Sequence, residues 1–195
     1  EKIKEKGFKA PSAIQKKTIP HLLREKGDLI AKAKTGTGKT AAFALPIIEQ
    51  LDESLNHIQA LVLVPTRELA IQVATEFSSF VDGGKFKAVA IYGGQSISEQ
   101  IRALKGKVSV VIGTPGRIID HLERKTLDIS KINFAVLDEA DEMLNMGFVE
   151  DMETILAKSN SDKKTLLFSA TMPDHVLKMD NRFMREYSVI ENESS

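Results

Sequence analysis

Residues 33–40 have the sequence Ala-Lys-Thr-Gly-Thr-Gly-Lys-Thr, a combination suited to binding phosphate. They follow the short apolar run 29–31 and precede residues 41–45, whose composition favours a helix. Glycines in a turn between a strand and a helix let successive backbone N–H groups point at phosphate oxygens, and the helix N-terminus adds partial positive charge. The strict pattern begins with glycine, whereas this chain has Ala33, which loses only the access to positive φ. The alternative interpretation is a surface turn.

Lys39 and Thr40 supply the side-chain chemistry of this segment. At the end of such a loop the lysine reaches the β- and γ-phosphates, and the hydroxyl binds Mg²⁺. The sequence therefore predicts a site for a nucleotide with its Mg²⁺, formed by Thr35, Gly36, Thr37, Gly38, Lys39 and Thr40.

A second chemical cluster, Asp138-Glu139-Ala140-Asp141, follows the apolar run 134–137. A carboxylate at the end of a buried strand is costly without a cationic partner, and a nucleotide-bound Mg²⁺ is such a partner. We predict that Asp138 holds this ion and that Glu139 orients and deprotonates an attacking water. Lys39, Asp138 and Glu139 are then the catalytic candidates. The alternative is an acidic helix N-terminus that needs no ligand.

The composition is that of an ordinary globular domain. The chain has 195 residues, 42% of them hydrophobic and 28% charged, which is enough for one domain with a core. Its 27 basic and 27 acidic residues cancel, so any nucleic-acid surface must be local. It has no cysteine, which excludes disulfides and thiolate metal sites. With no membrane-spanning run and no targeting signal visible, we expect a cytoplasmic protein, or a nuclear one in a eukaryote, without a membrane partner.

Short β-branched runs alternate with helical patterns along the chain. This alternation predicts an α/β fold with a doubly wound parallel sheet and helices on both faces, a three-layer α/β/α domain. In such sheets the ligand lies beyond the carboxyl ends of the strands. The predicted strands are 29–33, 60–64, 87–92, 108–112, 134–138 and 165–169, and the predicted helices are 12–24, 39–51, 67–80, 96–104, 116–123 and 148–157.

Residues 138–141 spell D-E-A-D, and the chain resembles the N-terminal RecA-like domain of a DEAD-box RNA helicase. The resemblance covers almost the whole chain, because the motifs of that domain occur in order. They are the Q motif at 7–15, motif I at 33–40, motif Ia at 65–70, the GG motif at 93–95, motif Ib at 114–117, motif II at 138–141 and motif III at 169–171.

The resemblance implies that the nucleotide is ATP. The Gln15 side-chain amide both donates and accepts, so it can pair with the N6/N7 edge of adenine, and the resemblance implies that it does. Phe8 is the candidate to stack on the adenine face. From the residues alone, a helix-surface glutamine and a core phenylalanine stay open as alternatives.

The resemblance also implies a track for the RNA backbone. Hydroxyls, glycine N–H groups, helix N-termini and arginines are the usual partners of phosphate oxygens, and binding of this kind is sequence-tolerant and sensitive to salt. The open alternatives are surface salt bridges for the arginines and a capping turn at Thr114. The implied contacts are Pro65, Thr66, Arg67, Gly94, Thr114, Pro115, Gly116 and Arg117.

Ser169 and Thr171 end the last predicted strand. The resemblance implies that these hydroxyls bond to the D-E-A-D segment and couple the nucleotide and RNA sites. Asp141 is implied as a partner in that network rather than as a metal ligand. The alternative is capping of the strand end.

The resemblance finally implies that residues 1–195 are one RecA-like domain of an ATP-dependent RNA helicase that unwinds short duplexes. These residues do not include the second RecA-like domain, which supplies arginines to the γ-phosphate in this family. An arginine finger of this type raises the rate of hydrolysis by about 10³–10⁵. We therefore expect the isolated domain to be monomeric, to bind nucleotide weakly and to be largely inactive. The alternatives are a phosphate-loop module without catalysis and a DNA-directed ATPase, which Gln15 and the D-E-A-D sequence disfavour.

Overall fold

The computed structural model describes residues 11–24, 27–34, 38–81, 83–171, 184 and 187–191. Four of the predicted site residues, Phe8, Thr35, Gly36 and Thr37, lie outside the described residues.

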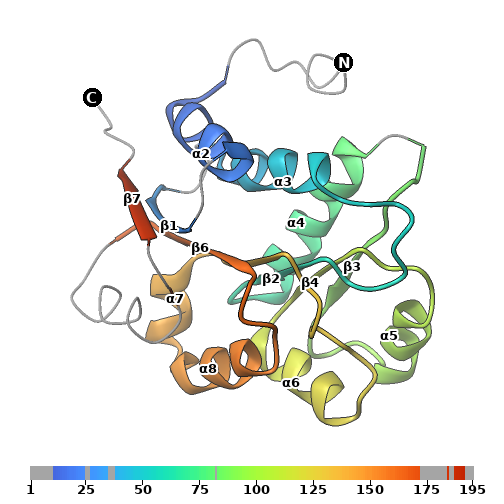
Figure 1. The fold of residues 1–195 in the computed structure, drawn as a ribbon. Coiled ribbons are helices and arrows are strands. Elements are labelled where there is room, and N and C mark those ends of the chain that lie inside the picture. Colours follow the sequence, from blue (N-terminus) through green and yellow to red (C-terminus); the bar gives the residue numbers. More distant parts are fainter. Residues whose placement is uncertain are drawn as a thin grey trace.

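Seven parallel strands form one sheet in the described part of the chain, in the order β3-β4-β2-β5-β6-β1-β7 (Figure 1). Only β6 separates β1 from β5, so the segments that follow these two strands emerge close together. The strands are β1 Asp28–Lys32, β2 Ala60–Leu63, β3 Ala88–Ile91, β4 Val110–Gly113, β5 Phe134–Leu137, β6 Lys164–Ser169 and β7 Tyr187–Glu191.

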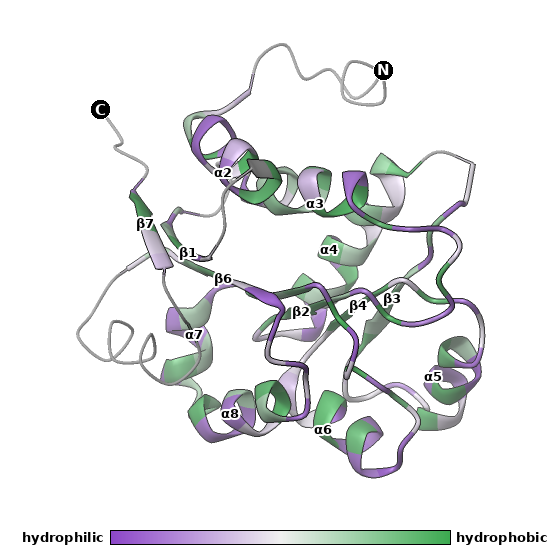
Figure 2. Cartoon of the chain, in the orientation of Figure 1, coloured by the Kyte–Doolittle hydropathy of each residue, from purple (hydrophilic) through white to green (hydrophobic). Residues whose placement is uncertain are grey.

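Helices cover both faces of the sheet and make a three-layer arrangement (Figure 1). One layer holds α2 Ala13–Arg24, α3 Lys39–Glu49 and α4 Arg67–Phe80. The other holds α5 Ile97–Leu104, α6 Pro115–Glu123, α7 Ala140–Asn145 and α8 Val149–Ala157. The apolar sides of the helices turn toward the sheet, and their polar sides turn outward (Figure 2).

Alternation of side chains along the strands divides the core into two clusters. In β1, Leu29 and Ala31 pack with α2 and α3, whereas Ile30 packs on the opposite face. The central strands β2, β4 and β5 are buried at every position, as expected for parallel strands covered on both faces. An unbroken apolar run therefore predicts such a strand well.

The predicted parallel sheet with helices on both faces is confirmed, and every predicted strand and helix has a counterpart within a few residues. The sequence analysis missed β7 and α7. β7 is an edge strand whose residues are mostly exposed, so its run Tyr-Ser-Val-Ile-Glu lacks the apolar signature of the central strands. α7 begins directly after Glu139, and at 6 residues it is too short to show a helical period.

All strands run in the same direction, so the segments that follow β1, β2, β3, β4, β5 and β6 lie along one edge of the sheet (Figure 1). Each predicted motif from residue 33 onward lies in one of these segments, except that Ser169 of the motif at 169–171 is the last residue of β6. Gly113, the last residue of β4, lets α6 approach this edge closely. A Cβ at Gly113 would lie 2.4 Å from Ile118 Cδ1 and 2.8 Å from the Ile91 carbonyl oxygen.

Within the described ranges, no helix is both long enough and apolar enough to cross a membrane.

Candidate functional site

Lys39 lies between the two carboxylates that the sequence analysis singled out. Its Nζ is 3.0 Å from Asp138 Oδ1 and 3.5 Å from Glu139 Oε1. Lys39 opens α3 after β1, and the two acids follow β5, so the predicted convergence of these two segments is present. The first turn of α3 is buried, including the side chains of Lys39 and Thr40.

The Asp138 carboxylate is buried, and the described residues stabilise its charge only in part. Its side chain is fully buried, and among the described residues Oδ2 has no hydrogen-bond partner. Burial raises the pKa of Asp138, and the Lys39 ammonium opposes that rise. A buried carboxylate oxygen without a partner is costly, and a cation would relieve that cost. The site therefore fits a bound Mg²⁺.

Glu139 is held in an uncommon backbone conformation. Its φ of 53° and ψ of 51° lie in the left-handed region, which costs free energy for a residue with a side chain. Glu139 is also the N-cap residue of α7. The turn from β5 into α7 thus passes through Glu139 and sets its carboxylate beside Lys39.

Gln15 connects helix α2 to the phosphate loop. Its Nε2 donates to the Gly38 carbonyl oxygen at 3.1 Å, and its Oε1 accepts from the Ser12 N–H at 3.0 Å. The Gln15 N–H donates in turn to Ser12 Oγ at 3.3 Å, which completes a reciprocal cap of α2. Gly38 has a φ of +77°, and a Cβ there would lie 2.5 Å from Gln15 Nε2. The positive φ makes any other residue strained at this position.

The Gln15 amide keeps hydrogen-bonding capacity beyond these contacts. A primary amide has two N–H donors and two acceptor lone pairs, and each of the two bonds described uses one of them. Of the alternatives left open, the helix-surface glutamine is wrong, because Gln15 is buried. The predicted partner Phe8 lies outside the described residues.

Asp141 and Thr171 are in direct contact. Asp141 Oδ2 accepts from Thr171 Oγ1 at 2.9 Å and from the Thr171 N–H at 3.2 Å. Ser169 Oγ donates to the Thr171 carbonyl oxygen at 2.6 Å. The end of β6 is therefore joined to α7 through Thr171, and Ser169 supports this contact without bonding to residues 138–141 itself.

The segments after β2 and β3 meet at Arg67. The Thr66 hydroxyl accepts from the Leu69 N–H at 3.2 Å and caps α4. The Arg67 guanidinium carbon lies 5.4 Å from the centre of the Tyr92 ring, and a Cβ at Gly94 would lie 3.4 Å from Arg67 Nη1. Arg67 is exposed and packs on an aromatic face, and it forms no ion pair with another described residue.

The segment after β4 presents the N-terminus of α6. Thr114 is the N-cap residue, as the alternative of a capping turn expects, but its side chain makes no capping hydrogen bond. Gly116 is exposed, and Arg117 is half-buried, with Nη1 donating to the Gln95 carbonyl oxygen at 3.0 Å and to Gln100 Oε1 at 3.2 Å. Pro65 and Pro115 are buried, and their contact with RNA stays a prediction.

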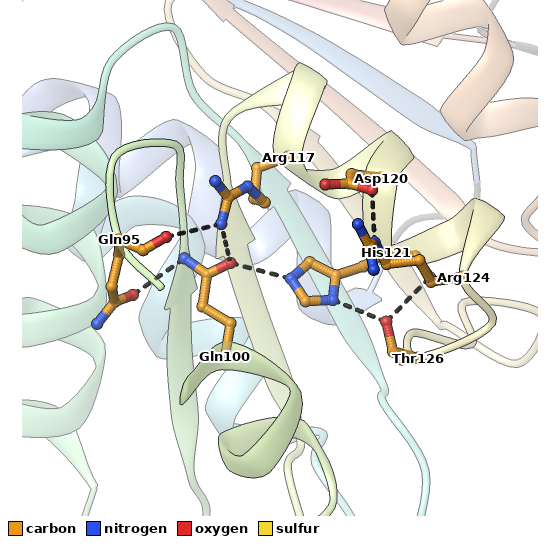
Figure 3. Close-up of polar contacts among 7 residues, drawn as sticks. All are labelled: Gln95, Gln100, Arg117, Asp120, His121, Arg124 and Thr126. Atoms are coloured by element: carbon orange, nitrogen blue, oxygen red, sulfur yellow. Dashed lines mark hydrogen bonds and ion pairs between the residues drawn. The ribbon is translucent and has the colours of Figure 1, made fainter. Parts of the chain in front are cut away.

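Sequence reasoning missed three side chains that position this edge: Ser12, Gln100 and His121. Ser12 and Gln15 have the spacing of a capping box, which was available as a signal. Gln100 and His121 lie on α5 and α6 and contact each other only in the fold, so no spacing along the chain predicts them (Figure 3). Among the described residues, no group of three or more His, Cys, Asp or Glu side chains could hold a metal by itself.

Known proteins resemble this chain over almost its whole length. A family model described as DEAD/DEAH box helicase matches residues 12–179. The chain is 51% identical over 188 residues to a protein of Methanocaldococcus jannaschii named as a probable ATP-dependent RNA helicase, covering 96% of this chain and 51% of that protein. It is 50% identical over 198 residues to the ATP-dependent RNA helicase DeaD of Escherichia coli, covering 100% of this chain and 31% of that protein.

Solved structures give the same result. The crystal structure of a DEAD box protein from the hyperthermophile Methanococcus jannaschii matches with a TM-score of 0.94 at 49% identity, covering 98% of this chain and 52% of that one. A hypothetical ATP-dependent RNA helicase from Sulfolobus tokodaii matches with a TM-score of 0.89 at 38% identity, covering 98% and 55%. The chain spans about half the length of these two proteins. From the family model, the sequence identity and the shared fold together, the chain belongs to the DEAD/DEAH box helicase family.

Proposed function

We propose that residues 1–195 form the N-terminal RecA-like, ATP-binding domain of an RNA-dependent ATPase that unwinds short RNA duplexes. The observation that carries the proposal is the position of Lys39 at the N-terminus of α3, 3.0 Å from Asp138 and 3.5 Å from Glu139. A lysine at a helix N-terminus beside two acids is the arrangement that a triphosphate and its cation need. The names of the relatives support RNA as the activator.

In this proposal Lys39 exchanges its carboxylate partners for the β- and γ-phosphates. The backbone N–H groups at the start of α3 and of the preceding loop bind the same phosphates, and Gly38 lets the backbone approach them. Thr40 and Asp138 would hold Mg²⁺, which would neutralise phosphate charge. Glu139 orients the attacking water and accepts its proton. Gln15 pairs with adenine and selects ATP over GTP.

RNA binds along the edge formed by the segments after β2, β3 and β4. Thr66, Arg67, Gly94, Gly116 and Arg117 contact its backbone, as does Thr114, whose hydroxyl is not used as a helix cap. Because these groups read phosphate and sugar, binding is sequence-tolerant and weakens with salt. The Asp141–Thr171 contact links the end of β6 to the segment that carries Asp138 and Glu139, and in this proposal it couples the nucleotide site to RNA binding.

The second RecA-like domain is a partner that this proposal requires. It supplies the arginine that stabilises charge in the transition state, a contribution of about 10³–10⁵ in rate. The chain by itself is then a monomer with weak nucleotide binding and little turnover.

The test is ATP hydrolysis by the full-length protein with single-stranded RNA, with DNA of the same sequence, and without nucleic acid. We expect RNA to raise the rate and DNA to have little effect. If RNA does not change the rate at any concentration, the alternative of a nucleotide-binding module without catalysis is favoured. Equal stimulation by DNA would instead indicate a DNA-directed ATPase.

A further inference from the structure

We propose that Gln100 is a positioning residue for nucleic-acid binding, which fixes the loop at residues 92–95 against Arg117 of α6. His121 in turn fixes the direction in which the Gln100 amide faces. Both side chains are buried, at 2% and 0% exposure, and neither belongs to the motifs of the sequence analysis. The inference rests on the proposed function, because it assigns these residues to the RNA-binding edge.

The orientation of the Gln100 amide follows from its partners. Its Nε2 is 2.7 Å from the Tyr92 carbonyl oxygen and 3.0 Å from Gln95 Oε1. A carbonyl oxygen only accepts, so the NH₂ group of Gln100 must face Tyr92. The Gln100 oxygen then faces α6, where Arg117 Nη1 lies 3.2 Å away (Figure 3).

This orientation also determines the tautomer of His121. His121 Nε2 lies 2.9 Å from Gln100 Oε1, which has no proton to give, so Nε2 carries the hydrogen and donates it. Nδ1 is then the acceptor in the neutral ring. Thr126 Oγ1 lies 2.8 Å from Nδ1, closer than the 3.2 Å to the His121 carbonyl oxygen, which is the other acceptor within reach of this hydroxyl. Burial lowers the pKa of His121 and favours this neutral form. The imidazole therefore supports the amide as a fixed donor.

The consequence is a rigid link among the segments proposed to bind RNA. Arg117 Nη1 donates to the Gln95 carbonyl oxygen and to Gln100 Oε1. These two hydrogen bonds hold α6 against the 92–95 loop and against α5. Tyr92, whose carbonyl Gln100 binds, carries Arg67 on its ring. Gln100 thus joins the segments after β2, β3 and β4 by hydrogen bonds and ring packing.

A second buried glutamine offers a matched control. Gln59 is 0% exposed and also bridges the backbone, with Nε2 2.8 Å from the Asp52 carbonyl oxygen and Oε1 2.9 Å from the Asp52 N–H. Gln59 directly precedes β2, at the opposite edge of the sheet from the proposed site. Replacing it removes comparable hydrogen bonds without touching the RNA-binding edge.

The experiment compares Gln100→Met with Gln59→Met in the full-length protein, with single-stranded oligouridylate as the probe. We expect Gln100→Met to raise the RNA concentration for half-maximal stimulation of ATP hydrolysis by about threefold to tenfold, the loss associated with one hydrogen bond. Gln59→Met should lower the melting temperature without this change. An equal response of the two variants to RNA would overturn the inference. A wild-type protein that RNA fails to stimulate would instead reject the proposed function, and this inference with it.

Two further comparisons keep the test decisive if Gln100→Met folds poorly. His121→Gln keeps a donor toward Gln100, whereas His121→Leu has a similar size and none, so only the leucine variant should need more RNA. In addition, combining Gln100→Met with Arg117→Met should weaken RNA binding by less than the product of the two single effects, because Gln100 acts in part through Arg117. Full additivity of the two substitutions, or equal RNA binding by both His121 variants, would overturn the inference.

Discussion

The Lys39 site and the Gln100 network lie along one edge of the sheet, but they differ in how completely their buried polar groups are hydrogen-bonded. At Lys39, charges face one another and the buried Asp138 Oδ2 has no hydrogen-bond partner among the described residues. Around Gln100, each donor meets an acceptor, with the Arg117 guanidinium among the donors, and both polar atoms of the Gln100 amide are bonded. A buried carboxylate oxygen without a hydrogen-bond partner indicates a site prepared for a ligand, whereas a fully bonded network indicates a frame that holds other groups in place.

The largest expected effect separates chemistry from binding at the charged site. Glu139→Gln removes the proposed base and keeps the side-chain volume, so turnover with RNA should fall by about 10²–10⁴ while ATP binding persists. Glu142→Gln is the matched control, because Glu142 is exposed on the same helix. Steady-state hydrolysis and a nucleotide-binding titration measure the two quantities, and a wild-type rate would remove Glu139 from the reaction.

Lys39→Ala tests the same site through affinity. The substitution removes the cation proposed to bind the phosphates, so ATP affinity should fall by about tenfold to a hundredfold, the range for a charge-assisted bond. Calorimetric titration with Mg²⁺-ATP measures it. Undiminished affinity would contradict the assignment of the loop.

A steric substitution tests the frame. A Cβ at Gly113 would approach Ile118 and the Ile91 carbonyl oxygen within 2.8 Å, so Gly113→Ala should lower the free energy of unfolding by about 1–3 kcal/mol. Gly116→Ala, in the same segment, meets nothing within 4 Å and should cost about 1 kcal/mol or less. Urea unfolding compares the two variants, and equal stabilities would show that α6 does not need the close approach.

Gln15→Ala should have a small effect on stability and on the choice of nucleotide. It removes the reciprocal cap with Ser12 and the bond to Gly38, so stability should fall by about 1 kcal/mol. In the same variant the preference for ATP over GTP should relax. Competition binding with the two nucleotides measures this preference, and retained discrimination would place the adenine-reading group elsewhere.

The smallest expected effect is a pH dependence of the free energy of unfolding that comes from His121 in the Gln100 network. Burial lowers the pKa of His121 below its ordinary value of 6.5; nearby Asp120 opposes the shift, and Arg117 and Arg124 add to it. The folded state thus binds a proton less readily than the unfolded chain, so the contribution of neutral His121 is present above pH 6.5 and is lost as pH falls below it. Unfolding free energy measured against pH should decline less steeply in His121→Gln. Parallel curves for the wild type and His121→Gln would contradict a lowered pKa of His121.

The two regions also differ in how far the sequence predicts them. The phosphate loop and the acidic segment are each local patterns, and the rule that parallel strands end at one edge brings Lys39 and Asp138 together. The Gln100–His121 contact depends on how α5 and α6 lie against each other, which no local pattern encodes. Likewise, the left-handed conformation of Glu139 and the close packing at Gly113 are properties of the tertiary structure.

The most direct test of the account is a crystal structure of this chain with Mg²⁺ and a non-hydrolysable ATP analogue. We predict that Lys39 Nζ leaves Asp138 for the terminal phosphates and that Asp138 lies in the coordination or water shell of the Mg²⁺. A nucleotide bound elsewhere, with the 3.0 Å contact of Lys39 and Asp138 unchanged, would contradict it.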